Sequence, residues 1–482
     1  MDEHEFRRVA GALRTFHKGF APLFGRKEAR RHGEQYVRGL LVQHAERRNA
    51  ENLAEAVVGT ADRDARALQQ FLTNSPWRHE RVVAALQRYL AERLLPQETD
   101  EAVAADGVWT LDSTGFAKRG TRSAGVARQY SGTLGKVDNC QLGVFLGYAT
   151  VRGHALVDGH LYLPREWADD PERCRQVGVP AAVLTAGYQS QADLGLALLR
   201  HARATGALVG RWVTADEAFG QVPAFRDALD AMGYWYVAEV PSTTPVFTAA
   251  PRTKRVRLTA APAAGPRAVE IQPAAQTVQA VAAALPPTRW QTLTVAEGAQ
   301  GPRTHAFAAL RVWESREEVP GRACWLVLRR NLDGRELKYY FSNAPADTPL
   351  ATLARVGATR WTVETEFQTG KGQVGLDEYE VRSWPGWHHH VTLCLLANAF
   401  LLALQQDWST DLRLAEGGKK GPDGRAPLRP ARHPATGRPS APRGATPAPL
   451  DPCRPAPLAG RDPAPQCLRP RRPRQTPAAP AA

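Results

Sequence analysis

The apolar run GVWTLD, residues 107–112, marks the point at which this sequence changes from a helical to an extended pattern. NCQLGVFLGYATV (139–151) and HALVDGHLYLP (154–164) follow, and their apolar side chains alternate around glycine-bearing turns, as in strands. Helical and strand-like segments then alternate: helices at 190–206 and 222–233, strands at 207–216 and 234–240. The order β-β-β-α-β-α-β predicts an α/β fold in which a mixed sheet carries helices on its faces.

The segments on either side of this region have their own patterns. Residues 1–100 show apolar residues at helical spacing and predict a helical domain, whose many arginines suit contact with a DNA backbone or an ordinary solvated surface. After the first part of the core (101–240), residues 241–345 are rich in β-formers and turns, which indicates a β-rich insertion. Residues 346–410 predict the final helices, one over 351–375 and a long apolar core helix that includes 388–406.

The C-terminal segment, 411–482, is expected to be a disordered tail. From residue 421 onward it holds 17 of the 37 prolines and 11 arginines, with no lysine or aromatic residue, so it cannot bury enough apolar surface to fold. Two interpretations stay open. The tail is either an arginine-rich arm that binds DNA non-specifically or the product of a frameshift in a GC-rich gene.

The composition indicates a folded protein with a polyanionic partner. The 482 residues include 62 Lys+Arg and 48 Asp+Glu, a net charge of +14, of which the tail from residue 421 carries +8. The six cysteines form no CxxC pair, which argues against a disulfide scaffold or a zinc ribbon. The N-terminal sequence has no apolar signal region and no uncharged apolar stretch is long enough for a membrane span, so we expect a cytoplasmic location and no membrane.

Three acidic residues stand where chemistry is expected. Asp112 ends the run GVWTLD, Asp216 ends VGRWVTAD, and Glu364 lies on the helix expected over 351–375. Acids at the carboxyl ends of strands in an open α/β sheet face the crevice where ligands bind. Carboxylates gathered there repel one another unless a divalent metal neutralises them, and hard oxygen ligands suit Mg²⁺ or Mn²⁺. Two such ions would serve phosphodiester cleavage.

The helix around Glu364 adds two cations to the carboxylate. Arg360, Glu364 and Lys371 are spaced at i, i+4 and i+11, which places them on nearly one helical face. A carboxylate for a metal and two cations for phosphate on one face are what a phosphodiester substrate requires. Glu366 is turned by about 200° from Glu364 and is expected to face away from the site.

At these residues the chain resembles the DDE transposases of insertion sequences, in particular the IS701-like group of the IS4 type. The resemblance covers residues from about 5 to about 405, and its most specific block is RWTVETEFQTGKGQVGLDEYEVRSWPGWHHHVTL at 360–393. Further matching stretches are ALQQFLTNSPW (67–77), LDSTGFAKRG (111–120), YSGTLGKVDNCQLGVFL (130–146), DGHLYLPREWADDPERC (158–174) and VTADEAFG (213–220).

The resemblance implies an RNase H-like core with an insertion before the last acid, and Mg²⁺-dependent cleavage and joining at transposon ends. It places Asp112, Asp216 and Glu364 as the catalytic, metal-binding acids, and Arg360 and Lys371 as the DNA-binding bases of the family's Tyr-x₂-Arg-x₃-Glu-x₆-Lys signature. Gly357 stands where that signature has tyrosine. The implied partners are double-stranded DNA, as terminal inverted repeats and target, and a second copy of the chain in a dimeric synapse within the nucleoid of a bacterium.

Several features keep alternative interpretations. A repurposed, catalytically inactive DNA-binding descendant of such an enzyme, or a nuclease without strand transfer, would have the same core. His388, His389 and His390 point in different directions on a helix, so we expect DNA backbone contact or a surface position rather than a metal site. Trp384 and Trp387 are expected to pack in the core. The basic stretch KRGTRSAGVARQY (118–130) is either a phosphate-binding loop or a solvated hairpin.

Overall fold

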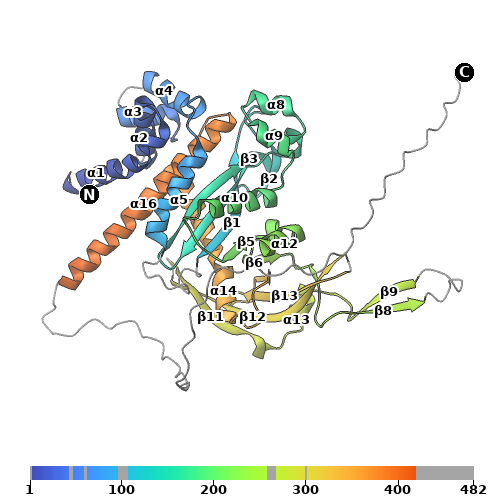
Figure 1. Cartoon of the computed structure of the whole chain (residues 1–482). Coiled ribbons are helices and arrows are strands. Elements are labelled where there is room, and N and C mark those ends of the chain that lie inside the picture. Colours follow the sequence, from blue (N-terminus) through green and yellow to red (C-terminus); the bar gives the residue numbers. More distant parts are fainter. Residues whose placement is uncertain are drawn as a thin grey trace, which may run out of the picture. The chain divides into compact units, whose positions relative to one another are not determined.

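The fold was examined in a computed structural model of the whole chain (Figure 1). It describes residues 3–42, 47–58, 62–95, 107–257, 267–298, 301–317 and 319–418. The tail expected over 411–482 lies outside the described residues from 419 onward. Residues 411–418 belong to the last helix, which therefore continues past the boundary expected at residue 410.

The N-terminal residues are helical, as the spacing of their apolar side chains predicts. The described residues between 3 and 95 form five helices and one 3₁₀ turn, and the aromatic residues Phe16, Phe20, Phe24, Phe71 and Trp77 are buried between them. The elements are α1 (Glu3–Phe20), η1 (Ala21–Phe24), α2 (Lys27–Leu41), α3 (Ala50–Val58), α4 (Asp62–Thr73) and α5 (His79–Leu94).

A mixed sheet forms the centre of the molecule. Strand β1 (Val108–Ala117) pairs antiparallel with β3 (Lys136–Thr150), which also pairs antiparallel with β2 (Ala127–Ser131) and β4 (Gly153–Leu161). On its other edge β1 pairs parallel with β5 (Trp212–Ala215), and β5 pairs parallel with β6 (Trp235–Val240). The expected α/β mixed sheet is confirmed. Strand β2 was not expected. It contains the last residues of the stretch 118–130 and forms a hairpin with β3.

The region expected as a β-rich insertion extends the same sheet. From β6 the order continues through β14 (Leu337–Ser342), β13 (Val319–Arg330), β12 (Gly301–Arg316), β7 (Pro245–Phe247) and β10 (Gln276–Thr277), with β11 (Gln291–Gly298) also on β12. Strands β8 (Arg252–Arg257) and β9 (Arg267–Gln272) form a separate ribbon. Two short helical elements accompany them, α13 (Val278–Ala283) and η2 (Pro287–Arg289).

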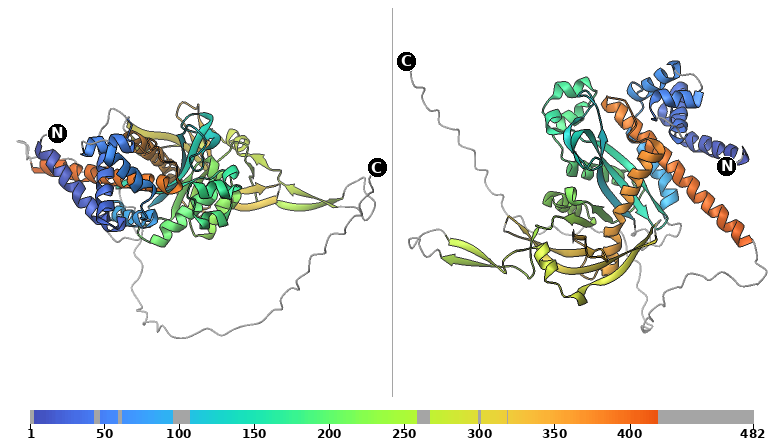
Figure 2. Two further views of the ribbon diagram at one scale, coloured as in Figure 1. Left: turned by 90° about the horizontal axis from the view of Figure 1, so that it is seen from above. Right: turned by 180° about the vertical axis from the view of Figure 1, so that it is seen from behind.

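Helices cover both faces of the central strands (Figure 2). Gly195 of α10 lies against Leu111, whereas Trp387 of α16 packs on Phe116, and residues of opposite parity on one strand point to opposite faces. The remaining helices are α7 (Arg165–Ala168), α8 (Pro171–Gln176), α9 (Ala181–Ala186), α10 (Gln191–Thr205), α11 (Glu217–Gly220), α12 (Pro223–Ala231), α14 (Leu350–Thr359), α15 (Trp361–Val374) and α16 (Trp384–Gly418).

The expected helix over 351–375 is divided at Arg360. The amide of Val363 donates to the carbonyl of Arg360 at 3.2 Å, and the hydroxyl of Thr362 donates to the carbonyl of Thr359 at 2.8 Å. These local bonds replace the regular helical pattern for one turn, so α14 ends and α15 begins at this residue. Arg360 therefore sits at the junction of two helices, and not within one.

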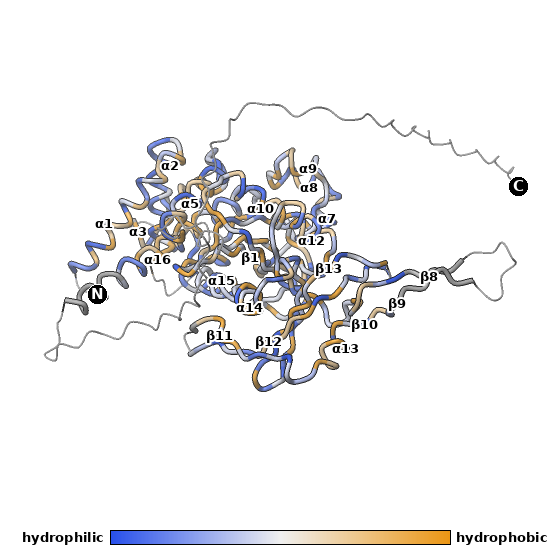
Figure 3. The backbone as a smooth tube through the Cα atoms, turned by 60° about the horizontal axis from the view of Figure 1, so that its bottom comes forward, coloured by the Kyte–Doolittle hydropathy of each residue, from blue (hydrophilic) through white to orange (hydrophobic). Residues whose placement is uncertain are grey.

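The long helix α16 packs between the N-terminal helices and the sheet, and its apolar stretches are visible in Figure 3. Its segment Trp384–Ser409 is long and apolar enough to cross a membrane by length and composition, but 83% of the apolar window is buried inside the protein. It is a core helix, as expected. Trp384 and Trp387 are buried within it, which confirms their packing role.

The expectation for the three histidines is wrong, because all three are buried. The ring nitrogens of His389 lie 2.7 Å from the carbonyl oxygen of Leu72 and 3.0 Å from that of Trp77, and the hydroxyl of Tyr36 lies 2.9 Å from Nδ1 of His390. Both histidines thus bind the N-terminal helices to α16. The spacing of the histidines along one helix could not reveal these partners, which come from distant parts of the chain.

Candidate functional site

The first two acids lie side by side at the edge where the parallel strands end. Leu111 of β1 pairs with Ala215 of β5, so the next residues, Asp112 and Asp216, are neighbours on strands that run about 4.8 Å apart. The expectation that Asp112 closes its strand is wrong: β1 continues to Ala117, since its antiparallel pairing with β3 persists to Cys140. Only the parallel pairing stops at the acid.

Both aspartates carry raised pKa values. Asp112 is only 8% exposed, and burial together with the charge of Asp216 raises its pKa to about 7. Burial also raises the pKa of Asp216, although its carboxylate accepts the backbone amides of Ala218 (3.0 Å) and Phe219 (3.4 Å) as the N-cap of α11. Two adjacent, desolvated carboxylates retain negative charge that the protein only partly balances.

Arg360 joins the first acid to the third. Its guanidinium donates to Asp112 at 3.1 Å and to Glu364 at 2.5 Å. Burial opposes its charge, but the carboxylates of Asp112 and Glu364 raise the pKa of Arg360 above its usual value. The side chain of Glu364 is 51% exposed, so α15 presents this carboxylate to solvent beside the buried aspartate pair.

Lys371, on α15, lies against strand β1, near the site but bonded to groups other than the acids. Its ammonium donates to the carbonyl of Gly115 at 3.1 Å and to the hydroxyl of Thr133 at 2.9 Å. Burial lowers its pKa. The structure therefore gathers the three predicted acids near the guanidinium of Arg360 and places Lys371 beside Gly115, three residues beyond Asp112.

A fourth acid, Glu239, was not predicted. Ala215 of β5 pairs with Ala238 of β6, so Glu239 continues the row of Asp112 and Asp216 onto the next strand. It is 5% exposed, its carboxylate accepts the ammonium of Lys338 at 2.5 Å, and its charge helps to raise the pKa of Asp216. The signal was available in the sequence, because Glu239 follows the apolar run YWYVA as Asp112 follows GVWTL.

The acids suit a divalent cation in their chemistry, but they are not yet arranged around one. Among the described residues, no three His, Cys, Asp or Glu side chains are placed to hold a metal ion. The reason is visible at Arg360, which draws Glu364 toward itself and supplies positive charge beside Asp112. The raised pKa values of the aspartate pair nevertheless indicate that a further cation would relieve its electrostatic strain.

Two neighbouring positions have different surroundings from the acids. Glu366, two residues after Glu364, binds Nδ1 of His154 at 2.6 Å and faces away from the aspartates, as expected. Gly357 faces β6, and a Cβ atom there would lie 3.1 Å from Cγ1 of Val237. Any side chain at this position therefore requires Val237 to move by a few tenths of an ångström.

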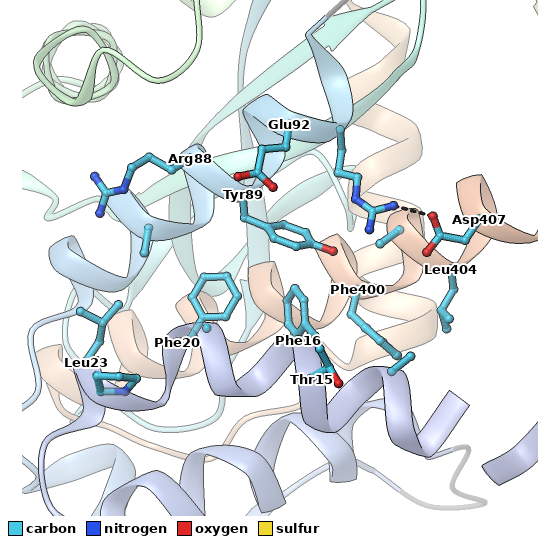
Figure 4. A pocket seen from close by; sticks show the side chains of 16 residues that line it. Thr15, Phe16, Phe20, Leu23, Arg88, Tyr89, Glu92, Phe400, Leu404 and Asp407 are labelled. Atoms are coloured by element: carbon cyan, nitrogen blue, oxygen red, sulfur yellow. Dashed lines mark hydrogen bonds and ion pairs between the residues drawn. The ribbon is translucent and has the colours of Figure 1, made fainter. Parts of the chain in front are cut away.

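The molecule also has a cavity of about 790 Å³ between α1, α5 and α16 (Figure 4). Phe16, Phe20, Tyr89 and Phe400 line it, and an ion pair between Arg93 and Asp407 (2.6 Å) lies at its edge. None of the five predicted site residues lines this space. This space is therefore separate from the acids.

Comparison with known proteins gives one family. A family model described as "DDE superfamily endonuclease" matches residues 19–302, which include Asp112 and Asp216. The matched range ends before Arg360, Glu364 and Lys371. No curated protein matches the chain.

Proposed function

Because the chain belongs to the DDE superfamily of endonucleases, we propose that it is a transposase that cleaves DNA at the ends of an insertion sequence and joins those ends to target DNA. Membership in the family implies a nuclease or transposase that acts on DNA. The observation that carries the finer proposal is the row of Asp112 and Asp216 on adjacent parallel strands, with Glu364 linked to it through Arg360.

Two features support an IS701-like enzyme with an RNase H-like core. The antiparallel strands β4, β3 and β1 are followed by the parallel strands β5 and β6, and the third acid comes from a helix after the β-rich insertion. The sequence block at 360–393 supplies the specific likeness to that group. We include double-stranded inverted repeats, a target duplex and a homodimeric synapse in this proposal.

The side chains have separable tasks in this mechanism. Asp112, Asp216 and Glu364 would hold the divalent cations, Mg²⁺ or Mn²⁺, which supply charge neutralisation and an activated water at the phosphodiester. Arg360 balances the acids in the free protein and is placed to bind a phosphate when they are neutralised. The first cut frees a 3′-hydroxyl at the transposon end, and that hydroxyl then displaces a phosphodiester oxygen in the target strand.

Cleavage of DNA that flanks the gene, with Mg²⁺ or Mn²⁺, tests the proposal. We expect Glu364→Gln to lower the cleavage rate more than about a hundred-fold, since it removes a ligand for the cation. Glu366→Gln is the matched control, because it alters a carboxylate on the same helix that binds His154 instead. Equal rates for Glu364→Gln and the control would contradict the assignment of the acids.

Two further readouts separate the alternatives. Joined products with a target plasmid distinguish a transposase from a nuclease that lacks strand transfer. A wild-type protein that shifts the DNA in a gel but does not cleave it, whichever metal is added, would indicate a repurposed DNA-binding protein and contradict the proposed chemistry.

A further inference from the structure

The hairpin between β2 and β3 exposes apolar side chains at its tip. Tyr130 is 62% exposed, Val137 53% and Leu134 38%. Tyr130 and Val137 are directly paired across the two strands, so they lie next to each other on one surface of the hairpin. A cluster of exposed apolar side chains usually marks a surface that binds a partner molecule.

The tip is fixed in place and is not a loose loop. The amide of Leu134 donates to the carbonyl of Ser131 at 3.1 Å, and Gly135 adopts the left-handed conformation (φ 63°) that closes the turn. Ser131 is fully buried, and the close approach of its hydroxyl leaves no room for a side chain at Gly115. The apolar groups at the tip are therefore presented by an ordered base.

The base of the hairpin lies beside the catalytic acids. The hydroxyls of Thr133 and Thr114 are 3.4 Å apart, and Thr114 points to the same face of β1 as Asp112, two residues away. Lys371 on α15 completes the link by donating to Thr133 and to Gly115. The strand that carries the first acid and the helix that carries the third thus both hold this turn.

Exposed cations lie near the apolar groups in the sequence, although one of them, Lys136, is paired with Asp138 at 3.1 Å. Arg128, two residues before Tyr130, lies on the same hairpin surface and is exposed, as are Lys136 and, in the preceding loop, Arg119 and Arg122. An apolar tip that carries Arg128 on the same surface and stands beside the acids of the proposed site matches a nucleic acid better than an apolar protein surface.

We propose that the tip of the β2–β3 hairpin engages the duplex next to the cleaved phosphodiester, with Tyr130 stacking on a base that is unpaired there and Leu134 and Val137 packing beside it. The inference rests on the proposed function for the position of the cut, but it assigns new residues to the recognition of DNA. Proteins that distort DNA use apolar side chains as wedges between bases in this manner.

The test compares binding to two probes in the presence of a chelator, so that it does not depend on cleavage. One probe is a fully paired duplex of the DNA that flanks the gene, and the other is the same duplex with mismatched bases at the transposon end. We expect the wild type to bind the mismatched probe about five-fold more tightly or better, because one base–aromatic stack is gained without the cost of unpairing. Tyr130→Ala should lose this preference and Tyr130→Phe should keep it.

Val151→Ser is the matched control. Val151 is more exposed than Tyr130, at 79%, and follows the opposite end of the strand that begins at the hairpin, so its replacement should leave the preference unchanged. A preference in Tyr130→Ala equal to that of the control, or equal binding of both probes by the wild type, contradicts the proposal. So does a loss of self-association in Tyr130→Ala with unchanged DNA binding, which would assign the tip to a second copy of the chain.

Failure of the proposed function gives a different pattern. A wild type that prefers the mismatched probe but cleaves no DNA with any metal would contradict the chemistry and leave the role of the hairpin standing. A wild type that binds neither probe would contradict both proposals together.

Discussion

Asp112 and Asp216 are destabilising where they stand. They are neighbours on adjacent strands, both are largely removed from water, and Arg360 is shared with Glu364. Residues that serve a reaction often reduce the stability of the free protein in this way, because the partner that balances them arrives only with the substrate or cofactor. The acids can therefore be tested by stability as well as by activity.

We predict that Asp112→Asn stabilises the metal-free protein. The pKa of Asp112 is raised from 3.8 to about 7, so the folded state holds this proton more tightly than the unfolded state does. The stability that the protonated carboxyl contributes is fully present below about pH 3.8 and is lost as the pH rises through 7. In urea unfolding with a chelator, the variant should gain on the order of 1 kcal/mol at pH 8 and less at pH 5. A variant that is less stable than the wild type at pH 8 would show that Arg360 already compensates the pair.

Gly357→Tyr, which restores the tyrosine of the family signature, should destabilise the fold. The new Cβ would begin 3.1 Å from Val237, and overpacking of this kind costs about 1–3 kcal/mol. Gly11→Tyr is the control, because that helical glycine has no neighbouring heavy atom within 4 Å of a Cβ. Equal stability of the two variants in urea would mean that β6 can yield at Val237.

What the sequence could and could not reveal differs from one residue to the next. Asp112 and Asp216 were recognisable because each follows an apolar run, and Arg360, Glu364 and Lys371 because their spacing is regular. Glu239 has the same local signal as the aspartates and was overlooked. His389 and His390 contact carbonyl and hydroxyl groups from α2, α4 and the segment after α4, and no pattern within α16 could predict those contacts. His388 instead faces the carbonyl of Trp384 within α16, at 3.0 Å from its Nδ1 atom.

At the scale of elements, α16 joins the N-terminal helices to the sheet through its histidines. Both nitrogens of His389 face carbonyl oxygens, and its ring stacks on Trp77 at a centroid distance of 3.7 Å. Burial lowers the pKa of His389 to about 4 and that of His390 to about 3. This contact between elements should therefore depend on pH.

We predict that acid weakens the protein through these histidines. Because the pKa of His389 is lowered from 6.5 to about 4, its contribution is fully present above pH 6.5 and is lost as the pH falls toward 4, by about 1.4 kcal/mol per pH unit. His389→Gln should reduce the slope of unfolding free energy against pH between 6.5 and 4. The exposed His4, replaced in the same way, is the control, and identical slopes for both variants would contradict the prediction.

A second connection between elements is a buried ion-pair network between α12 and β12. Glu314 binds Arg226 and Arg316, each at 2.8 Å, and Arg316 also binds Asp227 at 2.6 Å. The side chains of Glu314 and Arg226 are 3% and 4% exposed. This network fixes the second half of the sheet to a helix of the first half.

Glu314→Ala should lower the free energy of unfolding by about 3–5 kcal/mol, since it leaves the buried charge of Arg226 without a partner. Glu336→Ala, which breaks a more exposed pair with Arg329, should cost no more than about 1 kcal/mol. Urea unfolding of the two variants measures the difference. A small loss in Glu314→Ala would indicate that Arg226 finds another acceptor.

At the scale of the whole molecule, charge is divided unevenly along the chain. Residues 421–482 carry 11 arginines and three aspartates, whereas the remainder has a net charge of only +6. In the proposed function, the described residues would therefore bind DNA through individual cations such as Arg360, which lies beside Asp112, and not through a large net charge. The cytoplasmic, nucleoid-associated location stays a prediction.

We predict that a chain ending at Gly418 folds and cleaves DNA like the full chain. Loss of residues 419–482, whose 11 arginines and two lysines outweigh three aspartates by +10, should make non-specific DNA binding weaker and less dependent on salt, because fewer counterions are released. Affinity for an unrelated duplex across a salt series, together with the cleavage assay, measures both effects. Loss of cleavage on truncation would show that the tail takes part in the reaction.

The pairing of β6 with β14 has a consequence for how this protein can change. The chain leaves the central strands at Val240 and returns opposite the same residue at Tyr339, so the intervening segment begins and ends at one pair of hydrogen-bonded strands. Because the entropy of closing a segment grows only slowly with its length, a change in the length of this segment should cost little at that pair of strands, as long as Glu314 keeps its ion pair with Arg226 of α12. The segment between β6 and β14 is thus the part of the fold whose length can vary while Asp112 and Asp216 keep their positions on β1 and after β5.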